Sequence, residues 1–325
     1  MSAYLCVMLV GSLAVFALYG LRCARAVRLP VLRKNAWQTA LLAFLFSALF
    51  GTVLARCGYA LLMSELDFEY DGIEALEQLL EFEIDTVSFF CGAAGVMLGV
   101  LLANRLTRKG SVITGTDAFA PFGALLAALF RLGEHFFGSY GAGSVLAEGS
   151  PLAFFPFAVN ISVAGSNQDT WRWAVFALSA AFALVWAGIS FFRLRGKGRT
   201  GFSLTLTLFY LALPQILCES LRTRGMFWGP FVHTEELLCA LVLLGVMLFW
   251  ILKSGNGLSF PRRWGPLGIL LLGAGLLVAV EFAIDGKYFG LPVPICYLIM
   301  CAVLTAIGIA GAVAAKRYNS VQSFS

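Results

Sequence analysis

The chain has 325 residues, of which 60% are hydrophobic and 13% are charged, and its formal net charge is +5. A soluble domain carries about 25% charged residues, so this composition excludes an ordinary soluble protein. Apolar stretches of about 20 residues, the length that crosses a bilayer core, recur along the whole chain. Because the sequence lacks the short alternating segments of a membrane barrel, we predict an all-α, polytopic helical membrane protein.

About nine membrane spans are predicted, near residues 3–21, 37–60, 86–103, 112–132, 171–192, 202–218, 233–252, 265–285 and 291–315. The first span lacks a basic leading region and a small-residue cleavage site, which favours a retained span over a signal peptide. The eight cysteines lie mostly in or beside apolar runs without a CxxC motif, which argues against structural disulfides and a zinc site.

Basic residues gather in alternate connections between the predicted spans. These connections contain no acidic residue, and they are 22–36, 104–110, 193–199, 253–264 and the pair 316–317 near the end of the chain. The positive-inside rule makes this face cytoplasmic. The N-terminus is therefore expected outside and the C-terminus in the cytoplasm.

Two long excursions are expected on the outer face, over residues 61–85 and 133–170. Residues 65–85 contain many acids and no base, and Ile73, Leu76 and Leu80 recur there at helical spacing, which indicates a short solvated helix. The second excursion is rich in Gly, Ser, Phe and Ala and is too long for a tight turn.

Four arginines are expected at one depth near the outer boundary, and they are Arg56, Arg131, Arg222 and Arg224. Their guanidiniums would repel one another unless anions lie between them. Because the planar guanidinium fork suits phosphate, a shared site for a phospholipid headgroup is one interpretation. Snorkelling to the interface is the other.

Structural interpretations compete for several acids. Arg131–Glu134 and Glu219–Arg222 are each spaced i, i+3, so each pair could simply stabilise one helix end. Thr234, Glu235 and Glu236 favour the start of a helix. Asp117 is expected to cap the span at 112–132, with Pro121 in its first turns.

Four sequence blocks, in order across about residues 37–252, resemble the prolipoprotein diacylglyceryl transferases. ARCGYAL (55–61) is similar to the family's G-R-x-G-Y, and SFFCGAAGV (88–96) to its S-F-H-G-G-L-x-G-V. DAFAPFGALLAALFRLGEHF (117–136) resembles D-x-x-A-P followed by R-x-G-N-F, and QILCESLR (215–222) resembles R-F-x-x-E-x-x-R. The resemblance divides the chain into a transferase-like membrane domain, 1–252, and a C-terminal extension with two further spans, 253–325.

The resemblance implies a reaction at the outer face of the bacterial cytoplasmic membrane. A diacylglyceryl group passes from phosphatidylglycerol to the thiol of a lipoprotein-precursor cysteine, and glycerol phosphate leaves. The implied partners are phosphatidylglycerol, the precursor peptide and membrane lipids, with no nucleic acid, metal or cofactor. The implied substrate-binding residues are Arg56, Gly92, Arg131, Glu219 and Arg222.

Departures from the family pattern concern proton transfer. Phe90 stands where the family has His or Tyr, Gln215 replaces an Arg, and Glu134 and His135 replace Asn and Phe. We therefore assign Glu134 and His135 as candidate catalytic residues, with His135 as the base. The missing proton-transfer position also motivates the alternative of a non-catalytic lipid- or lipoprotein-binding protein with the same fold. A small-solute transporter is less favoured, because the sequence shows no inverted repeat.

Overall fold

A computed structural model describes residues 2–26, 30–63, 87–108, 112–147, 149–162, 169–193, 199–222, 227–228, 232–254, 259–284 and 290–320. Within these residues nine helices are long and apolar enough to cross a membrane. They are α1 (Ser2–Ala24), α3 (Ala36–Met63), α5 (Phe89–Thr107), α6 (Val112–Gly133), α7 (Val175–Arg193), α8 (Phe202–Ser220), α9 (Thr234–Lys253), α10 (Phe260–Ile284) and α11 (Val293–Ser320). The expected all-α, multi-pass membrane fold is confirmed.

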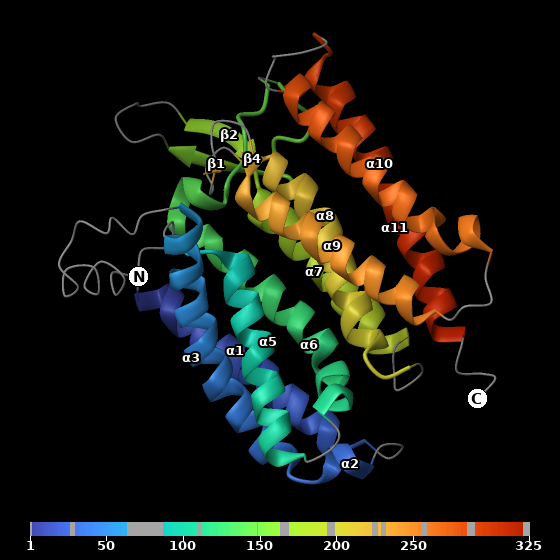
Figure 1. Cartoon of the computed structure of the whole chain (residues 1–325). Coiled ribbons are helices and arrows are strands. Elements are labelled where there is room, and N and C mark those ends of the chain that lie inside the picture. The colour runs from blue at the N-terminus through green and yellow to red at the C-terminus, as the bar shows by residue number, and fades with distance from the viewer. Residues whose placement is uncertain are drawn as a thin grey trace, which may run out of the picture.

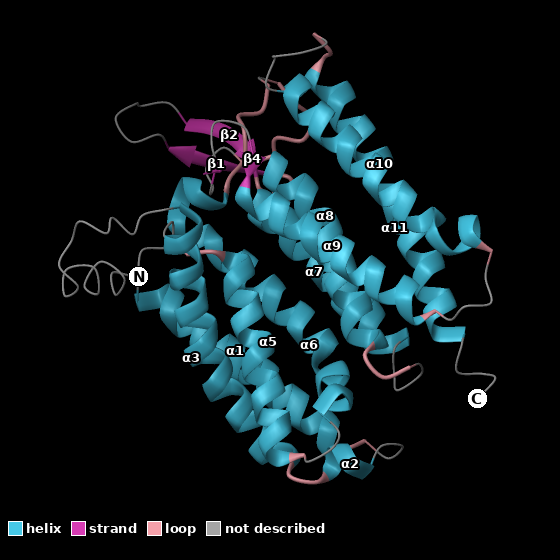
Figure 2. Cartoon of the chain, in the orientation of Figure 1, coloured by secondary structure: helices cyan, strands magenta, loops and turns pink. Residues whose placement is uncertain are grey.

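Short elements complete the described chain. They are α2 (Pro30–Arg33), the 3-10 helix η2 (Glu134–Gly141), and two antiparallel hairpins, β1 (Ala158–Ser162) with β2 (Asp169–Trp173) and β3 (Phe227–Trp228) with β4 (Val232–His233). Figures 1 and 2 show the strands together at one end of the bundle. The span predicted at 171–192 starts later, because residues 171–173 belong to β2. The acidic stretch 65–85 lies outside the described residues.

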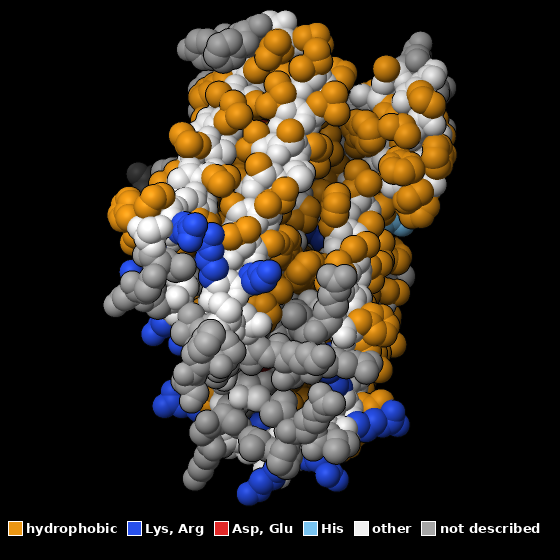
Figure 3. All heavy atoms as spheres, turned by 90° about the vertical axis from the view of Figure 1, so that its right-hand side faces the viewer, with side chains coloured by type: hydrophobic (Ala, Val, Ile, Leu, Met, Phe, Trp, Pro, Cys, Tyr) orange, Lys and Arg blue, Asp and Glu red, His pale blue; other side chains and the backbone are white. Residues whose placement is uncertain are grey.

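The chain passes back and forth along the bundle, so α1 begins and α11 ends at opposite ends of it (Figure 1). In Figure 3 the Lys and Arg side chains gather toward one end, below a surface of apolar side chains. This segregation is what the alternate basic connections predict. The assignment of the basic end to the cytoplasm stays a prediction.

Two apolar cores hold the helices together. One core joins α1, α3, α5 and α6 around the fully buried Tyr19, Val100 and Phe119. The other joins α8, α9, α10 and α11 around Trp250 and Met300. The C-terminal extension expected from the sequence therefore shares a core with α8 and α9.

Helices α3 and α5 approach each other closely along glycines of α5. A Cβ atom at Gly95 would lie 2.2 Å from the Phe50 carbonyl oxygen, and one at Gly99 would lie 2.5 Å from the Ser47 nitrogen. Small residues allow such backbone contact between membrane helices. The contact places the start of α5 beside the end of α3, where the Ser88 N–H donates to the Ala55 carbonyl at 3.0 Å.

Asp117 caps a different helix from the one predicted. Helix α6 already begins at Val112, and the Asp117 carboxylate accepts hydrogen bonds from the Gly201 N–H at 2.5 Å and the Leu204 N–H at 2.9 Å. These donors belong to the first turn of α8, whose N–H groups have no helical partner. The expectation that Asp117 caps its own span is wrong, and its carboxylate instead ties α6 to α8.

Candidate functional site

Four charged side chains, from α6, from η2, from the end of α8 and from the segment just after it, meet in one buried cluster, which we call the charge quartet. It consists of Arg131, Glu134, Glu219 and Arg222. Arg131 Nη1 lies 2.6 Å from Glu134 Oε1, and its Nη2 lies 3.1 Å from Glu219 Oε1. Arg222 Nη2 lies 2.6 Å from Glu134 Oε2, and its Nε lies 3.2 Å from Glu219 Oε1. Each charge therefore faces two of the opposite sign.

The quartet is closed off from solvent. Its four residues expose only 3% to 6% of their surface. Two guanidiniums and two carboxylates cancel formally, which is the condition under which buried charges persist. Removing one member would leave an uncompensated charge, and breaking a buried pair in this way costs about 3–5 kcal/mol.

Local geometry brings each half of the quartet into place. Helix α6 ends at Gly133 and η2 begins directly at Glu134, so the helical path continues from Arg131 to Glu134 and the two residues lie on adjoining turns. Glu219 and Arg222 are likewise separated by three residues at the end of α8. Both short spacings bring side chains onto one face.

A backbone contact joins the two halves. The Ser144 N–H, just after η2, donates to the Leu221 carbonyl at 3.2 Å, and the neighbouring Gly143 pairs with Arg222 as an isolated β-bridge. A Cβ at Gly143 would lie 2.5 Å from the Leu221 oxygen, so only glycine fits this approach. The glycines after the Arg131 helix thus include one that is needed to hold the segment against α8.

Neighbouring side chains extend the quartet. The Phe89 ring centroid lies 3.8 Å from Arg131 Cζ, a cation–π contact that covers the guanidinium face. Gln215 Nε2 donates to Glu219 Oε1 at 2.5 Å. Arg131 Nε is buried and has no hydrogen-bond partner among the described residues. One donor of the site is therefore available to a bound acceptor.

A further buried carboxylate, that of Glu235, lies at the start of α9. Its Oε1 accepts from Ser88 Oγ at 2.7 Å and from the Phe90 N–H at 3.5 Å, and both donors belong to the start of α5. Its Oε2 is buried without a hydrogen-bond partner among the described residues. The predicted helix start holds, since α9 begins at Thr234. The hydrogen bonds from Ser88 and Phe90 to Glu235 could not be predicted from the sequence around Glu235.

The other candidate residues lie around the quartet or outside it. Arg56 is buried on α3 with its Cζ 5.8 Å from the Tyr59 ring centroid. Gly92 faces α3, where an added Cβ would lie 3.2 Å from Ala55 Cβ, so its observed contact is helix packing. His135 is exposed, and its ring centroid lies 5.2 Å from that of Phe176.

The anions that the clustered arginines require come from the chain itself. Both i, i+3 pairs that the sequence offered as structural alternatives, Arg131–Glu134 and Glu219–Arg222, are present in the quartet. Each arginine is also bound to the glutamate of the other pair. Arg224, the fourth arginine of the predicted group, lies outside the described residues.

Three comparisons with known proteins found no match for this chain, whether a family model, a curated protein or a solved structure. Among the described residues, no three or more His, Cys, Asp or Glu side chains are placed to hold a metal ion. The functional interpretation therefore depends on the quartet and on the sequence blocks that contain it.

Proposed function

We propose that this chain is a divergent membrane transferase of the prolipoprotein diacylglyceryl transferase type, acting at the outer face of the bacterial cytoplasmic membrane. Its donor would be phosphatidylglycerol and its acceptor the cysteine thiol of a lipoprotein precursor. The observation that carries the proposal is that residues from separate blocks of the resemblance meet in space. Arg131, Glu219 and Arg222 come from two blocks of the resemblance, and they lie in one buried cluster.

In the proposed reaction a carbon–sulfur bond replaces a carbon–oxygen bond. The thiol sulfur attacks the diacylglyceryl carbon that carries the phosphate ester, and glycerol phosphate leaves with the bonding electrons. The thiol proton passes to a base, for which His135 and Glu134 are the candidates. Arg131 and Arg222 would stabilise the charge on the departing phosphate, as guanidiniums commonly do.

The quartet supports this role in one respect and restricts it in another. Arg131 retains a buried Nε donor without a partner among the described residues, and Phe89 covers its face. A phosphate in the site must, however, compete with the Glu134 carboxylate, which already lies 2.6 Å from each arginine. The resemblance places a neutral Asn at this position.

This competition favours a second candidate function, a non-catalytic lipid- or lipoprotein-binding membrane protein. The side chain of Phe90 cannot accept or donate a proton, and its backbone N–H donates to Glu235. His135, the proposed base, is exposed and is not a member of the quartet. A protein that binds the lipid or the precursor needs neither group for proton transfer.

The deciding experiment incubates purified protein with phosphatidylglycerol and a peptide that contains the lipoprotein cysteine motif. Mass spectrometry then reads the peptide for an added diacylglyceryl group, with a Cys→Ser peptide as the control. A thioether product supports the transferase. Lipid or peptide binding without product supports the second function, and the absence of both overturns the two candidates together.

A further inference from the structure

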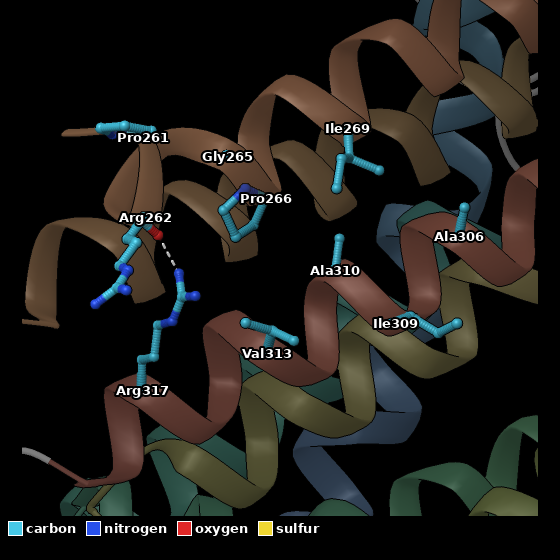
Figure 4. A pocket seen from close by; sticks show the side chains of 10 residues that line it. All are labelled: Pro261, Arg262, Gly265, Pro266, Ile269, Ala306, Ile309, Ala310, Val313 and Arg317. Atoms are coloured by element: carbon cyan, nitrogen blue, oxygen red, sulfur yellow. Dashed lines mark hydrogen bonds between the residues drawn. The ribbon is translucent and has the colours of Figure 1, made fainter. Parts of the chain in front are cut away.

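A groove opens between α10 and α11 at the basic end of the bundle, away from the charge quartet. Its volume is about 540 Å³, within the range of sites that hold small ligands. Figure 4 shows Ile269 of α10 pointing toward Ala310 of α11, and Pro266, Ala306, Ile309 and Val313 also line the groove. Ile269, Ile309 and Val313 are 45%, 63% and 39% exposed, so the groove wall is apolar and accessible.

Two arginines lie at the mouth of this groove, and the sequence explains the position of one of them. Pro266 has no N–H, so the carbonyl of Arg262, four residues earlier in α10, loses its helical donor. Arg317 Nη1, from α11, donates to this carbonyl instead (Figure 4). The Arg317 guanidinium is thereby held across the mouth beside Arg262.

The charge around the mouth is entirely positive in sequence. Residues 253–264, which include Arg262 and Arg263, contain no acid, and Lys316 and Arg317 stand together at the end of α11. Arginine donates through five N–H groups, so the one bond that Arg317 makes among the described residues, to the Arg262 carbonyl, leaves most of its donors for another acceptor. An apolar groove below a cationic mouth complements an amphipathic anion.

We propose that this groove binds one anionic phospholipid from the leaflet at the basic end of the bundle. The phosphate would lie between the guanidiniums of Arg262 and Arg317, and one acyl chain would lie against Ile269, Ile309 and Val313. Basic pockets between membrane helices bind anionic headgroups in this manner. The proposal is independent of the transferase reaction. The charge quartet lies where α6 and α8 end, at the other end of the bundle from this groove.

The test measures lipid binding to the full-length protein in detergent by native mass spectrometry. The probes are phosphatidylserine, which is anionic, and phosphatidylcholine, which is zwitterionic, with identical acyl chains. Each basic side chain near an anionic lipid contributes about a fivefold preference, so two arginines predict a preference of about 25-fold. Equal affinity for the two lipids would overturn the proposal.

Two matched glycine variants test the groove itself. An added Cβ meets nothing within 4 Å at either Gly265, which lines the groove, or Gly268, which does not. Gly265→Phe should therefore place a ring in the groove and abolish the preference, whereas Gly268→Phe should preserve it. Retained preference in Gly265→Phe, or equal loss in both variants at unchanged thermal stability, would contradict the proposed site.

Two arginine variants test the mouth. Arg262→Ala should lower the affinity for phosphatidylserine about fivefold, while the backbone carbonyl that accepts from Arg317 remains. Arg105 is exposed in the last turn of α5, at the same end of the bundle as the groove but outside its lining. Arg105→Ala should therefore leave the affinity unchanged. If Arg105→Ala weakens binding as much as Arg262→Ala does, the preference is a general effect of surface charge and the proposal is wrong.

Discussion

Replacing Glu134 by glutamine unbalances the charge quartet while it preserves the shape of the side chain. Glu134 contacts both arginines at 2.6 Å, and without its charge two buried guanidiniums face the single carboxylate of Glu219. An uncompensated buried charge costs about 3–5 kcal/mol. We therefore expect Glu134→Gln to lower the free energy of unfolding by about this amount.

A second substitution should restore part of that loss. Arg131→Gln produces the opposite imbalance, whereas the double variant leaves Arg222 and Glu219 as a neutral pair 3.2 Å apart. Groups within one ion-pair network show coupling of about 0.5–3 kcal/mol. We expect a value in the upper half of this range, so the double variant should be clearly more stable than the sum of the single losses predicts.

The assay is equilibrium unfolding of the wild type, both single variants and the double variant in the same detergent. Losses that add within about 0.5 kcal/mol would refute the account of the quartet as a coupled unit. A single loss below about 1 kcal/mol for Glu134→Gln would place the quartet with exposed ion pairs, which contribute little. Either result would contradict the interpretation of the quartet as a buried and coupled group of charges.

Three other predictions concern the base, the interhelical cap and the topology. His135→Ala should lower turnover about 10²–10⁴-fold if its imidazole accepts the thiol proton, and an unchanged rate in the thioether assay would remove it from catalysis. Asp117→Ala should cost about 0.5–2 kcal/mol of stability, because two N–H groups of α8 lose their acceptor; wild-type unfolding would contradict this. Single cysteines on a cysteine-free background should react with an impermeant reagent from outside at position 70, and at position 197 only after permeabilisation; the reverse pattern would invert the orientation.

The membrane spans could be predicted because length and apolarity are local properties of the sequence. The span expected at 112–132 is the helix Val112–Gly133, and the one expected at 202–218 is Phe202–Ser220. The span expected at 171–192 begins four residues late, at Val175, because Trp171 and Trp173 belong to β2. Aromatic residues at a membrane boundary suit either structure, so apolarity alone does not place that helix start.

The site could be predicted only in part. The spacing of Arg131–Glu134 and of Glu219–Arg222 indicates two local pairs, but the bonds that join them connect residues 88 positions apart. The charge pattern and the resemblance both grouped Arg131 with Arg222, but neither indicated that Glu134 lies between them. For a short acid such as Asp117, sequence spacing cannot tell whether the carboxylate caps its own helix or a neighbouring one.

The central claim is that Arg131 contacts the phosphate of phosphatidylglycerol with two donors, the Nε without a hydrogen-bond partner among the described residues and an Nη that a glutamate now binds. A comparison of lysine with alanine at this position tests the claim most directly. A bidentate charge-assisted contact contributes about 1.5–3 kcal/mol, which corresponds to about 10- to 150-fold in affinity. Lysine keeps the charge but loses the fork, so Arg131→Lys should weaken binding nearly as much as Arg131→Ala. The measurement is phosphatidylglycerol affinity of the wild type and both variants in nanodiscs, with thermal stability as the folding control. Similar losses in the two variants would support the contact, wild-type affinity in Arg131→Lys would contradict the fork, and wild-type affinity in both would remove Arg131 from the site.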